Sequence, residues 1–401
     1  MTHVIKTDQE ALDAAGELGA RFATGSAARD ADRVLPGAEL DELSASGLLG
    51  ITVPREHGGA AVSSRTLGEV FRLLSAGDSS IGQIPQNHFF FLNVLRHNGT
   101  PEQLAFFHAE VLAGKRFGNA LAEAGTKDAQ TFRTRITPAA GGGFRLNGTK
   151  NYSTGALFAH WVPVFALDDR DRLNAVFVPA GADGLTVLDD WGGMGQRTTA
   201  SGTVHLEDVH VPDEHVVPHH RTFSREETFG AFGQFLHAAI DVGIAEAALR
   251  DGGAAVRDLA RPWWESGVDT AAAEPLVVQQ FGELALRARA ARALLGEAGD
   301  ALDEADRVLA EESGTHGAAR AAAEASAAVA AVRAQADTAA VSVSSDIFAL
   351  AGTRSALDER NLHRHWRNAR THTLHDPRRW KVQHLGDYEL NDIFPPANGI
   401  V

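Results

Sequence analysis

The sequence predicts an α+β protein with a helical N-terminal domain, a central antiparallel β domain and a C-terminal helical bundle. Helical periodicity up to about residue 115, short β-rich runs after it and alanine-rich helical stretches from about residue 226 support this order. At 401 residues the chain is also too long for one simple core. We therefore expect domains at residues 1–115, 116–225 and 226–401.

Two segments of the first domain carry clear helix signals. In LGEVFRLL (67–74) apolar residues recur at i, i+3, i+4 and i+7, which places them on one face of a helix. In TPEQ (100–103) threonine and glutamine form a capping box, and proline occupies the first helical position. We expect a helix over each segment, the first of them ending near Gly77.

The central domain is recognised by short strand-like runs. WVPVFAL (161–167), NAVFVPA (174–180) and GTVHLEDVHVP (202–212) are rich in β-branched and aromatic residues and are bounded by Asp, Gly or Pro. Asn147-Gly148 lies between strand-like residues, and this dipeptide is the strongest short-range hairpin signal. We expect a compact antiparallel sheet with a tight turn at Asn147-Gly148.

Alanine dominates the third domain, most plainly in GAARAAAEASAAVAAVRAQADTAAVSVSSDIFALAG (317–352). Large residues recur among the alanines, so the stretch predicts long, closely packed helices rather than a low-complexity linker. The final run, GDYELNDIFPPANGIV (386–401), is apolar and lacks helical periodicity. We expect an extended tail there, or a loose terminus.

The composition excludes several classes of protein. A net charge of −15 argues against a nucleic-acid partner, which needs a basic surface. The absence of cysteine excludes disulfides, thiolate nucleophiles and Cys-based metal sites. The N-terminus is amphipathic and acidic, and no window is apolar enough to span a membrane, so we expect a cytoplasmic protein without membrane contact.

Common catalytic motifs are missing. No G-x-G-x-x-G opens a helix after a strand, and neither H-E-x-x-H nor G-x-S-x-G occurs. If the protein carries out redox chemistry, NAD(P)H is not bound in the usual way.

Six stretches spread over nearly the whole chain carry recognisable motifs. They are GLLGITVPREHGG (47–59), ALAEAGTKDAQ (120–130), FRLNGTKNYSTGALFAHW (144–161), MGQRTTASGTVHLEDVHVP (194–212), IFALAGTRS (347–355) and HRHWRNARTHTLHDP (363–377). These stretches resemble the acyl-CoA dehydrogenase superfamily and follow one another in family order. The histidine-rich ending resembles the flavin-dependent monooxygenase branch, which includes dibenzothiophene monooxygenases and sulfur-acquisition oxidoreductases.

This resemblance implies an acyl-CoA dehydrogenase-like fold and a monooxygenase that takes reduced flavin, FMN or FAD, with O₂ as co-substrate. Such enzymes work through a C4a-hydroperoxyflavin and oxygenate a small apolar or heteroaromatic substrate, here organosulfur or indole-like. A separate flavin reductase supplies the reduced flavin. The resemblance further implies a homotetramer, in which the C-terminal tail closes a neighbouring subunit's site.

An acyl-CoA dehydrogenase is the alternative activity. Its carboxylate base removes a proton next to the thioester, and the resemblance places Asp376 at the position of the usual glutamate. Aspartate is shorter by one methylene, and Pro377 biases the residue before it towards extended conformations. The dehydrogenase base is therefore degraded but not excluded.

Catalytic residues are also implied by the resemblance. It assigns proton handling to His88, in QNHFFFLN, and to His375, with His372 in support and Ser153 of NYSTG beside the flavin. Histidine suits this work because its pKa lies near neutral. Plain structural interpretations stay open: a core histidine bonded to backbone for His88, a capped turn for His375 and a surface strand position for Ser153.

Cofactor contacts follow from the same resemblance. The dehydrogenases carry an arginine in an E-R-x-x-F-G motif, which RPWWESGVDTAAAEP (261–275) lacks, so Arg261 is the substitute we expect. This departure leaves the choice between FMN and FAD open. The expected cofactor-binding residues are Asn119, Ser153, Thr154, Trp191, Thr199, Ser201 and Arg261.

Histidines gather between residues 363 and 384, and such clusters are typical of metal sites. Three histidines, or two with the Asp376 carboxylate, are a chemically possible set of ligands. However, the H-x-H pair His363 and His365 does not share a helix face, and nothing in the sequence orders a second shell. We expect no metal. The histidines of this stretch are His363, His365, His372, His375 and His384.

Overall fold

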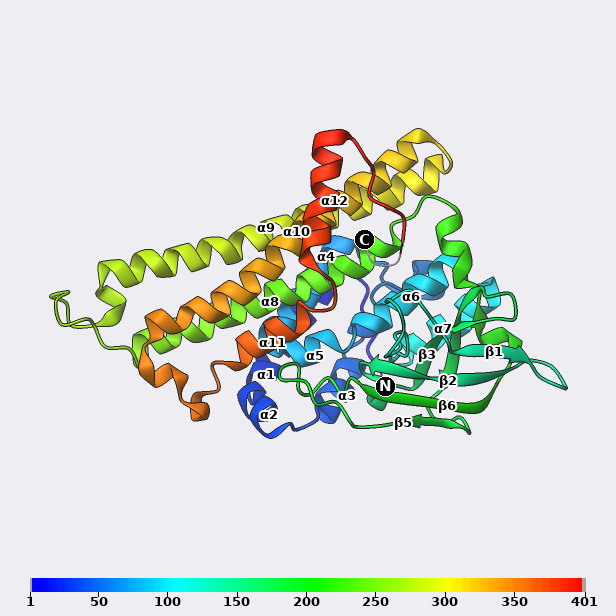
Figure 1. Ribbon diagram of the computed structural model, residues 1–401, viewed down its shortest axis with the longest axis horizontal. Coiled ribbons are helices and arrows are strands. Elements are labelled where there is room, and N and C mark those ends of the chain that lie inside the picture. Colours follow the sequence, from blue (N-terminus) through cyan, green and yellow to red (C-terminus); the bar gives the residue numbers. More distant parts are fainter. Residues whose placement is uncertain (1, 399–401) are drawn as a thin grey trace.

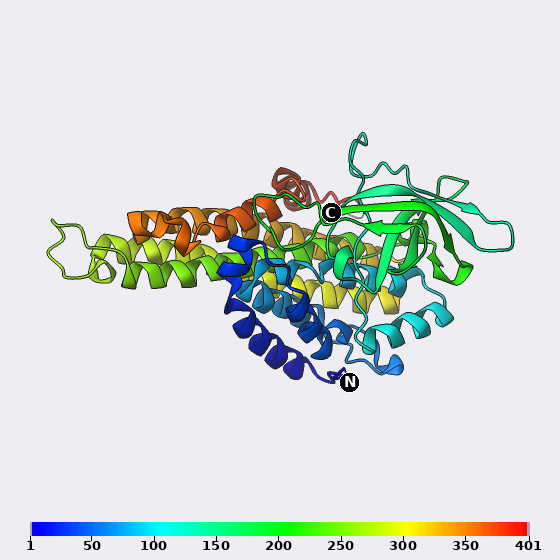
Figure 2. The same ribbon diagram turned by 90° about the horizontal axis from the view of Figure 1, so that it is seen from below.

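The computed structural model describes residues 2–398. An elongated helical bundle has a sheet at one end, and the N-terminal helices pack along the side of the bundle next to the sheet (Figures 1 and 2). The N-terminal helices are α1 (Asp8–Ala23), α2 (Ser26–Asp32), α3 (Gly37–Ala45), α4 (Ser64–Gly77), α5 (Ser79–Gln83), α6 (Gln86–Asn98) and α7 (Pro101–Leu112).

Both predicted helices of this domain are confirmed. In α4 the residues of the apolar stripe are buried, and the helix ends at Gly77. At the start of α7 the Gln103 N–H donates to the Thr100 side chain, and the Gln103 side chain in turn caps the Thr100 backbone N–H. The capping box therefore supplies partners for two N–H groups that have none inside the helix.

The sheet is mixed rather than purely antiparallel. Its order is β5-β6-β2-β1-β3-β4-β7, in which β1 and β3 are parallel and the other neighbours are antiparallel. The strands include the three predicted runs. They are β1 (Arg135–Pro138), β2 (Phe144–Ser153), β3 (Trp161–Leu167), β4 (Leu173–Pro179), β5 (Leu185–Val187), β6 (Gly202–Val211) and β7 (Val216–Val217).

The hairpin predicted at Asn147-Gly148 is wrong. Both residues lie inside β2, where the pairing with β6 shifts register between Leu146 and Gly148. The Asn147 side chain accepts a hydrogen bond from the Asp208 N–H at 2.8 Å, so the dipeptide forms an irregularity in the strand and not its end. The turn between β1 and β2 instead uses the three glycines 141–143, which all have positive φ.

Long helices form the third domain, as the alanine-rich sequence predicts. They are α8 (Phe229–Asp258), α9 (Pro275–Glu312), α10 (His316–Ala351), α11 (Arg364–His372) and α12 (Arg378–Asn391). Buried alanines line α8 and α10. Their small side chains let the helix axes approach closely, and Figures 1 and 2 show α8, α9 and α10 running side by side.

The extended tail begins later than predicted. Residues 386–391 continue α12, which ends where Asp392 adopts the left-handed conformation. Only the segment from Asp392 onward lacks regular structure, and the final residues, 399–401, lie outside the described part. Within residues 2–398, none of the helices combines the length and apolarity that a bilayer crossing requires.

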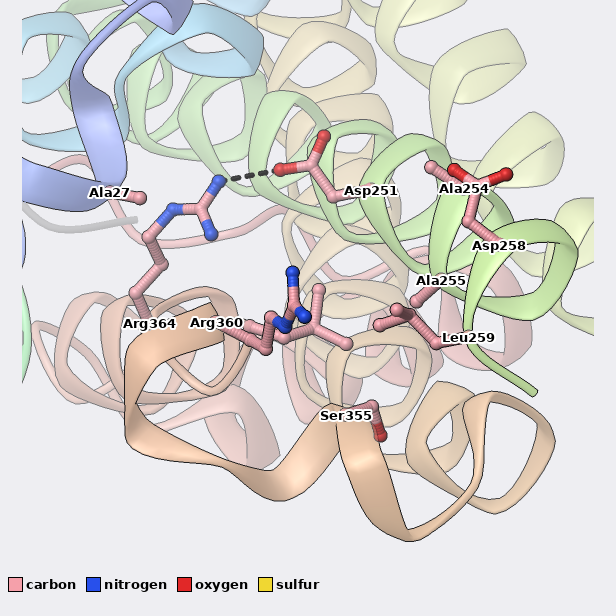
Figure 3. Close-up of a pocket in the computed structure, with 10 residues that line it drawn as sticks. Ala27, Asp251, Ala254, Ala255, Asp258, Leu259, Ser355, Arg360 and Arg364 are labelled. Carbon is pink, nitrogen blue, oxygen red and sulfur yellow. Dashed lines mark hydrogen bonds and ion pairs between the residues drawn. The ribbon is translucent and has the colours of Figure 1, made fainter.

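Helix α11 is attached to α8 through Asp251. The Arg364 guanidinium donates to Asp251 Oδ2 at 2.5 Å, and His365 Nε2 lies 2.9 Å from the same oxygen. The bonded side chains of Asp251 and Arg364 both line a pocket of about 360 Å³ (Figure 3). Burial alone would raise the pKa of Asp251, but the hydrogen bond with His365 and the nearby arginines hold it well below its ordinary value.

This attachment should weaken in acid. The folded pKa of Asp251 lies below its ordinary value of 3.8, so its stabilisation is complete above that value and is lost as pH falls below it. We expect Asp251→Asn to lower the free energy of unfolding near neutral pH, and the difference from wild type to shrink below about pH 4. Urea unfolding across pH measures this. A difference that grows in acid would contradict the assignment.

Candidate active site

The candidate site lies at the seam where the loop before β6 meets α5 and α11. One side chain joins all three segments: Asn368 of α11 accepts from the Gln196 N–H at 2.7 Å and donates to Ser79 Oγ at 2.8 Å. Gly195 packs directly against the backbone of Arg367, where a side chain would collide. The β domain is therefore fixed against the helix that carries His372.

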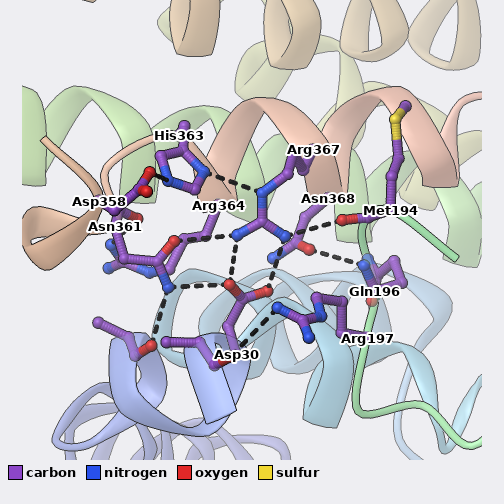
Figure 4. Close-up of polar contacts among 12 residues, drawn as sticks. Asp30, Met194, Gln196, Arg197, Asp358, Asn361, His363, Arg364, Arg367 and Asn368 are labelled. Atoms are coloured by element: carbon purple, nitrogen blue, oxygen red, sulfur yellow. Dashed lines mark hydrogen bonds and ion pairs between the residues drawn. The ribbon is translucent and has the colours of Figure 1, made fainter. Parts of the chain in front are cut away.

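A second network reinforces the seam. Arg367 forms an ion pair with Asp30 of α2 and donates to Asn361 Oδ1 at 2.9 Å and to Met194 O at 2.8 Å (Figure 4). Asn361 Nδ2 donates in turn to Asp30 Oδ2 at 2.8 Å. These contacts join α2, α11 and the loop before β6, although the residues are far apart in sequence.

The side-chain hydroxyls of Thr154, Thr199 and Ser201, which the resemblance assigned to cofactor binding, form one chain of hydrogen bonds. Ser201 Oγ lies 2.7 Å from both Thr154 Oγ1 and Thr199 Oγ1, and Thr199 Oγ1 donates to the carbonyl oxygen of Gln196 at 2.9 Å. Trp191 Nε1 donates to the same carbonyl at 2.8 Å. The structure thus brings together four of the residues that the resemblance assigned to the cofactor.

Several buried polar atoms beside this chain have no partner among residues 2–398. They include Ser153 Oγ, Asn119 Oδ1, both amide atoms of Gln196 and Gln83 Oε1. Buried polar groups are nearly always hydrogen-bonded, so unpartnered ones gathered at one seam indicate a polar ligand. A flavin ring carries donors and acceptors along one edge and fits this set. Next to it, Tyr152, Trp191 and Ser201 line a cleft of about 350 Å³.

His375 lies on the helical side of the seam, just after α11. Its Nδ1–H donates to the carbonyl oxygen of His372 at 2.7 Å, and its Nε2 lies 3.2 Å from the Gln83 amide nitrogen, which donates to it. Although one edge of the ring is open on the chain's surface, the surrounding protein displaces water and lowers the pKa of His375. The ring is therefore neutral at pH 7, with Nε2 as its acceptor.

His372 is fully buried and bonded on both sides. Its Nδ1 lies 2.6 Å from Asp241 Oδ1, and its Nε2 lies 3.1 Å from His237 Nδ1. Asp241 also pairs with Arg333 of α10. The sequence analysis missed His237, Asp241 and Arg333. A signal did exist, because Gln234, His237 and Asp241 recur on one face of the first half of α8, which is otherwise apolar.

Three histidine rings meet here. His237, His372 and His375 each offer one ring nitrogen, and these atoms lie within 4.8 Å of one another. The sequence could not reveal this cluster, because His237 comes from α8, 135 residues before His372. Two of the rings are joined by the contact between His237 Nδ1 and His372 Nε2, and His375 Nε2 accepts a hydrogen bond from Gln83.

His88 lies in the core. Its Nε2–H donates to the carbonyl oxygen of Leu49 at 2.9 Å, and the Phe117 N–H donates to its Nδ1 at 3.1 Å. Burial lowers the pKa of His88 to about 4, so the ring is neutral. With both nitrogens bound to backbone, this geometry favours the structural interpretation of His88 over proton transfer.

Two further predicted residues lie in different surroundings. Asp376 Oδ2 accepts a hydrogen bond from the Gln234 amide at 2.7 Å, so the dehydrogenase-type carboxylate is held by α8. Arg261 is exposed in the loop that joins α8 to α9. Figure 1 shows this loop at the end of the bundle opposite the sheet. Within one chain it is therefore far from Ser153.

The chain matches three family descriptions in order: acyl-CoA dehydrogenase N-terminal domain at residues 7–115, middle domain at 120–209 and C-terminal domain at 235–378. It is 30% identical to dibenzothiophene monooxygenase of Rhodococcus erythropolis, over 97% of this chain and 95% of that one. It is 29% identical to the probable FMNH₂-dependent monooxygenase SfnC of Pseudomonas putida, over 96% of each.

Solved structures agree. TdsC from Paenibacillus sp. A11-2, in its complex with FMN and indole, superimposes with a TM-score of 0.90 at 28% identity, covering 98% of this chain and 99% of that one. The similarity extends over all three domains, and it includes the ordered stretches from which the resemblance was drawn. The chain belongs to the acyl-CoA dehydrogenase superfamily, in the branch of the flavin-dependent monooxygenases.

Proposed function

We propose that this protein is a reduced-flavin-dependent monooxygenase that oxygenates a small apolar or heteroaromatic substrate by way of a C4a-hydroperoxyflavin. One observation carries the proposal: neutral His375 and His372 lie beside unpartnered buried polar atoms, and His375 directly precedes the position at which the resemblance places the dehydrogenase carboxylate. The neighbouring Asp376 carboxylate is bonded to Gln234. A neutral histidine brings no charge into the resting pocket, and it can accept a proton on one ring nitrogen while it releases one from the other.

FMN is the flavin that we infer, because TdsC is described with FMN and SfnC is named for FMNH₂. Bound reduced flavin supplies two electrons and the activation of O₂. Ser153 and Asn119 would hold the ring through their unpartnered oxygens, and Trp191 would cover it from the adjacent cleft. The hydrogen-bonded hydroxyls of Thr154, Thr199 and Ser201 would bind the phosphate-bearing side chain of FMN.

The substrate class follows from the relatives and from the apolar wall. Dibenzothiophene and indole are both flat, apolar heteroaromatic molecules, and each is named with a relative. On the N-terminal side of the seam, Leu40, Leu49, Ile84 and Phe117 are buried around Gly155. Such a wall excludes water, which limits the loss of reducing equivalents to hydrogen peroxide.

A decisive test supplies FMN, NADH, a separate flavin reductase and ¹⁸O₂, with indole or dibenzothiophene as the probe. Mass spectrometry should find product that carries one ¹⁸O atom. The control omits the reductase and should yield none. If probes stay unchanged while an acyl-CoA bleaches the oxidised flavoprotein, the chain is a dehydrogenase with Asp376 as its base.

We also infer a homotetramer from the family. Trp263, Trp264 and Leu276, around the start of α9, have exposed fractions of 60%, 78% and 65% in the single chain. Exposed apolar groups of this size mark contact surfaces. Light scattering should give a mass near four chains for wild type and a smaller mass for Trp263→Ser/Trp264→Ser. A variant that keeps the wild-type mass would exclude this surface from the interface.

A further inference from the structure

Asp241 is a carboxylate at the centre of the helical bundle. Neither Asp241 nor His372 is exposed to solvent, and Arg333 is only 2% exposed. Asp241 uses one oxygen for Arg333 and the other for His372 Nδ1, at 2.6 Å. A buried carboxylate is costly unless its charge is paired and its oxygens are hydrogen-bonded. Both conditions are met here by residues from α10 and α11.

These partners determine which ring nitrogen carries the proton on His372 and, through His372, on His237. A carboxylate accepts, so His372 carries its proton on Nδ1, and its Nε2 is left as an acceptor. His237 must then donate from Nδ1 across the 3.1 Å contact. This leaves His237 Nε2 with a free lone pair, and among residues 2–398 the structure records no hydrogen bond to this atom.

The third histidine is tied to the same chain. The His375 ring lies 4.8 Å from the His237 ring and 5.0 Å from the His372 ring, measured between centroids. Its Nδ1–H is bound to the His372 carbonyl, so the position of His375 depends on how His372 is held. Asp241 therefore sets the orientation of the His372 ring directly, and it sets the orientation of the His237 and His375 rings through His372.

We propose that Asp241 and Arg333 are positioning residues that hold His372 in one tautomer, and that His237 Nε2 is the proton acceptor which this arrangement presents to the reaction site. The proton-acceptor role of His237 rests on the proposed monooxygenase function, whereas the tautomer assignment of His372 and His237 does not depend on it. The arrangement assigns a role to α8 and α10, whereas none of the residues implied by the family resemblance lies on either helix.

The proton step balances without any further reactant. A proton released by the substrate atom that is oxygenated forms a bond to His237 Nε2, and the His237 Nδ1–H bond breaks as that proton passes to His372 Nε2. The positive charge then lies on His372, next to the Asp241 carboxylate. No electron moves in this step. The starting state is restored when the His372 Nε2 proton returns to His237 Nδ1 across the same contact and His237 Nε2 releases its proton to water.

The surroundings contain charges of both signs. Burial raises the pKa of Asp241 to about 6, although the positive charge of Arg333 opposes that rise. Burial, followed by the neighbouring histidines and cations, lowers the pKa of His237 well below its usual value. Titratable and charged groups face these hydrogen-bonded residues from α8, α10, α11, α12 and the turn before α12. They are Asp241, Arg333, Asp337, Arg370, His372, His375, Asp376, Arg378 and Lys381.

Two variants test the proposal. Asp241→Asn keeps the shape but lets the amide donate to His372 Nδ1, which reverses the tautomer. His237→Gln removes the acceptor and leaves the Asp241–Arg333 pair intact, so it stays informative even if Asp241→Asn folds poorly. Each should lower kcat roughly 10²-fold or more with KM changed less than about threefold, using the probe that wild type oxygenates.

A pH profile separates this role from simple packing. In wild type kcat should fall as pH drops through about 6, because Asp241 then becomes protonated. Asp241→Asn should lack that limb. The matched control is Asp337→Asn, which removes a carboxylate from the same surroundings without a bond to His372. It should retain wild-type kcat and the acid limb.

Tautomers are read without turnover, from long-range ¹H–¹⁵N spectra of the flavin-free protein labelled at histidine. Wild type should show His372 and His237 protonated on Nδ1, and Asp241→Asn should move the His372 proton to Nε2. An unchanged His372 signal in Asp241→Asn, or wild-type kcat in His237→Gln, would overturn the inference. If wild type oxygenates no probe, the proposed function fails, and the spectra alone still decide the tautomer chain.

Discussion

Replacing His375 with alanine is expected to abolish product formation while FMN still binds. The ring lies next to His237 and presents Nε2 at the helical side of the seam, whereas the expected flavin contacts come from the β domain. Removing one positioned proton-transfer group costs roughly 10²- to 10⁴-fold in rate. Product carrying ¹⁸O should fall to background in the reductase-coupled assay, with FMN affinity, followed by fluorescence quenching, within about threefold of wild type.

The matched control is His210→Ala, which removes an exposed histidine from β6, outside the seam. It should leave both product yield and FMN affinity unchanged. Wild-type yield in His375→Ala would refute the catalytic role and would favour the capped turn. A loss of FMN affinity together with product would instead assign His375 to cofactor binding.

Arg29→Met is expected to cause a large loss of stability. Arg29 is buried and donates to Asp78 Oδ2 from Nε at 3.1 Å and from a terminal nitrogen at 2.9 Å. Asp78 also caps α5, since its side chain accepts from the N–H groups of Ser80 and Ile81. Removing one partner of a buried pair leaves an uncompensated charge, which costs about 3–5 kcal/mol. The urea midpoint at fixed protein concentration should fall accordingly.

This loss should also reach the active site, because α5 carries Gln83, whose amide contacts His375, and Ser79, which contacts Asn368. We therefore expect weaker FMN binding under conditions where the variant is still folded. Arg307→Met is the matched control, since Arg307 pairs with Glu304 and Glu311 on the exposed face of α9. A midpoint for Arg29→Met no lower than that of Arg307→Met would contradict the assignment.

Local signals in the sequence were reliable for the helices. The stripe in LGEVFRLL and the capping box in TPEQ depend on residues three or four positions apart, which lie within one turn of a helix. The three β-rich runs became strands for a similar reason, because the β-branched and aromatic composition of a short run is also a local property. The hairpin signal failed because the residue pairing of β2 with β6, a long-range contact, overrode the preference of Asn147-Gly148 for a turn.

The sequence by itself determined the order of the domains, the superfamily and the histidine-rich turn, because periodicity, composition and ordered motifs express these. Only the tertiary structure decided what surrounds that turn. His372 meets Asp241 and His237 from α8, and Arg333 from α10 completes the pair, although each is far away in sequence. The partner of a buried polar group depends on which helices pack together. The same packing bound both nitrogens of His88 to backbone groups. It also placed the loop that carries Arg261 at the end of the bundle opposite the sheet (Figure 1).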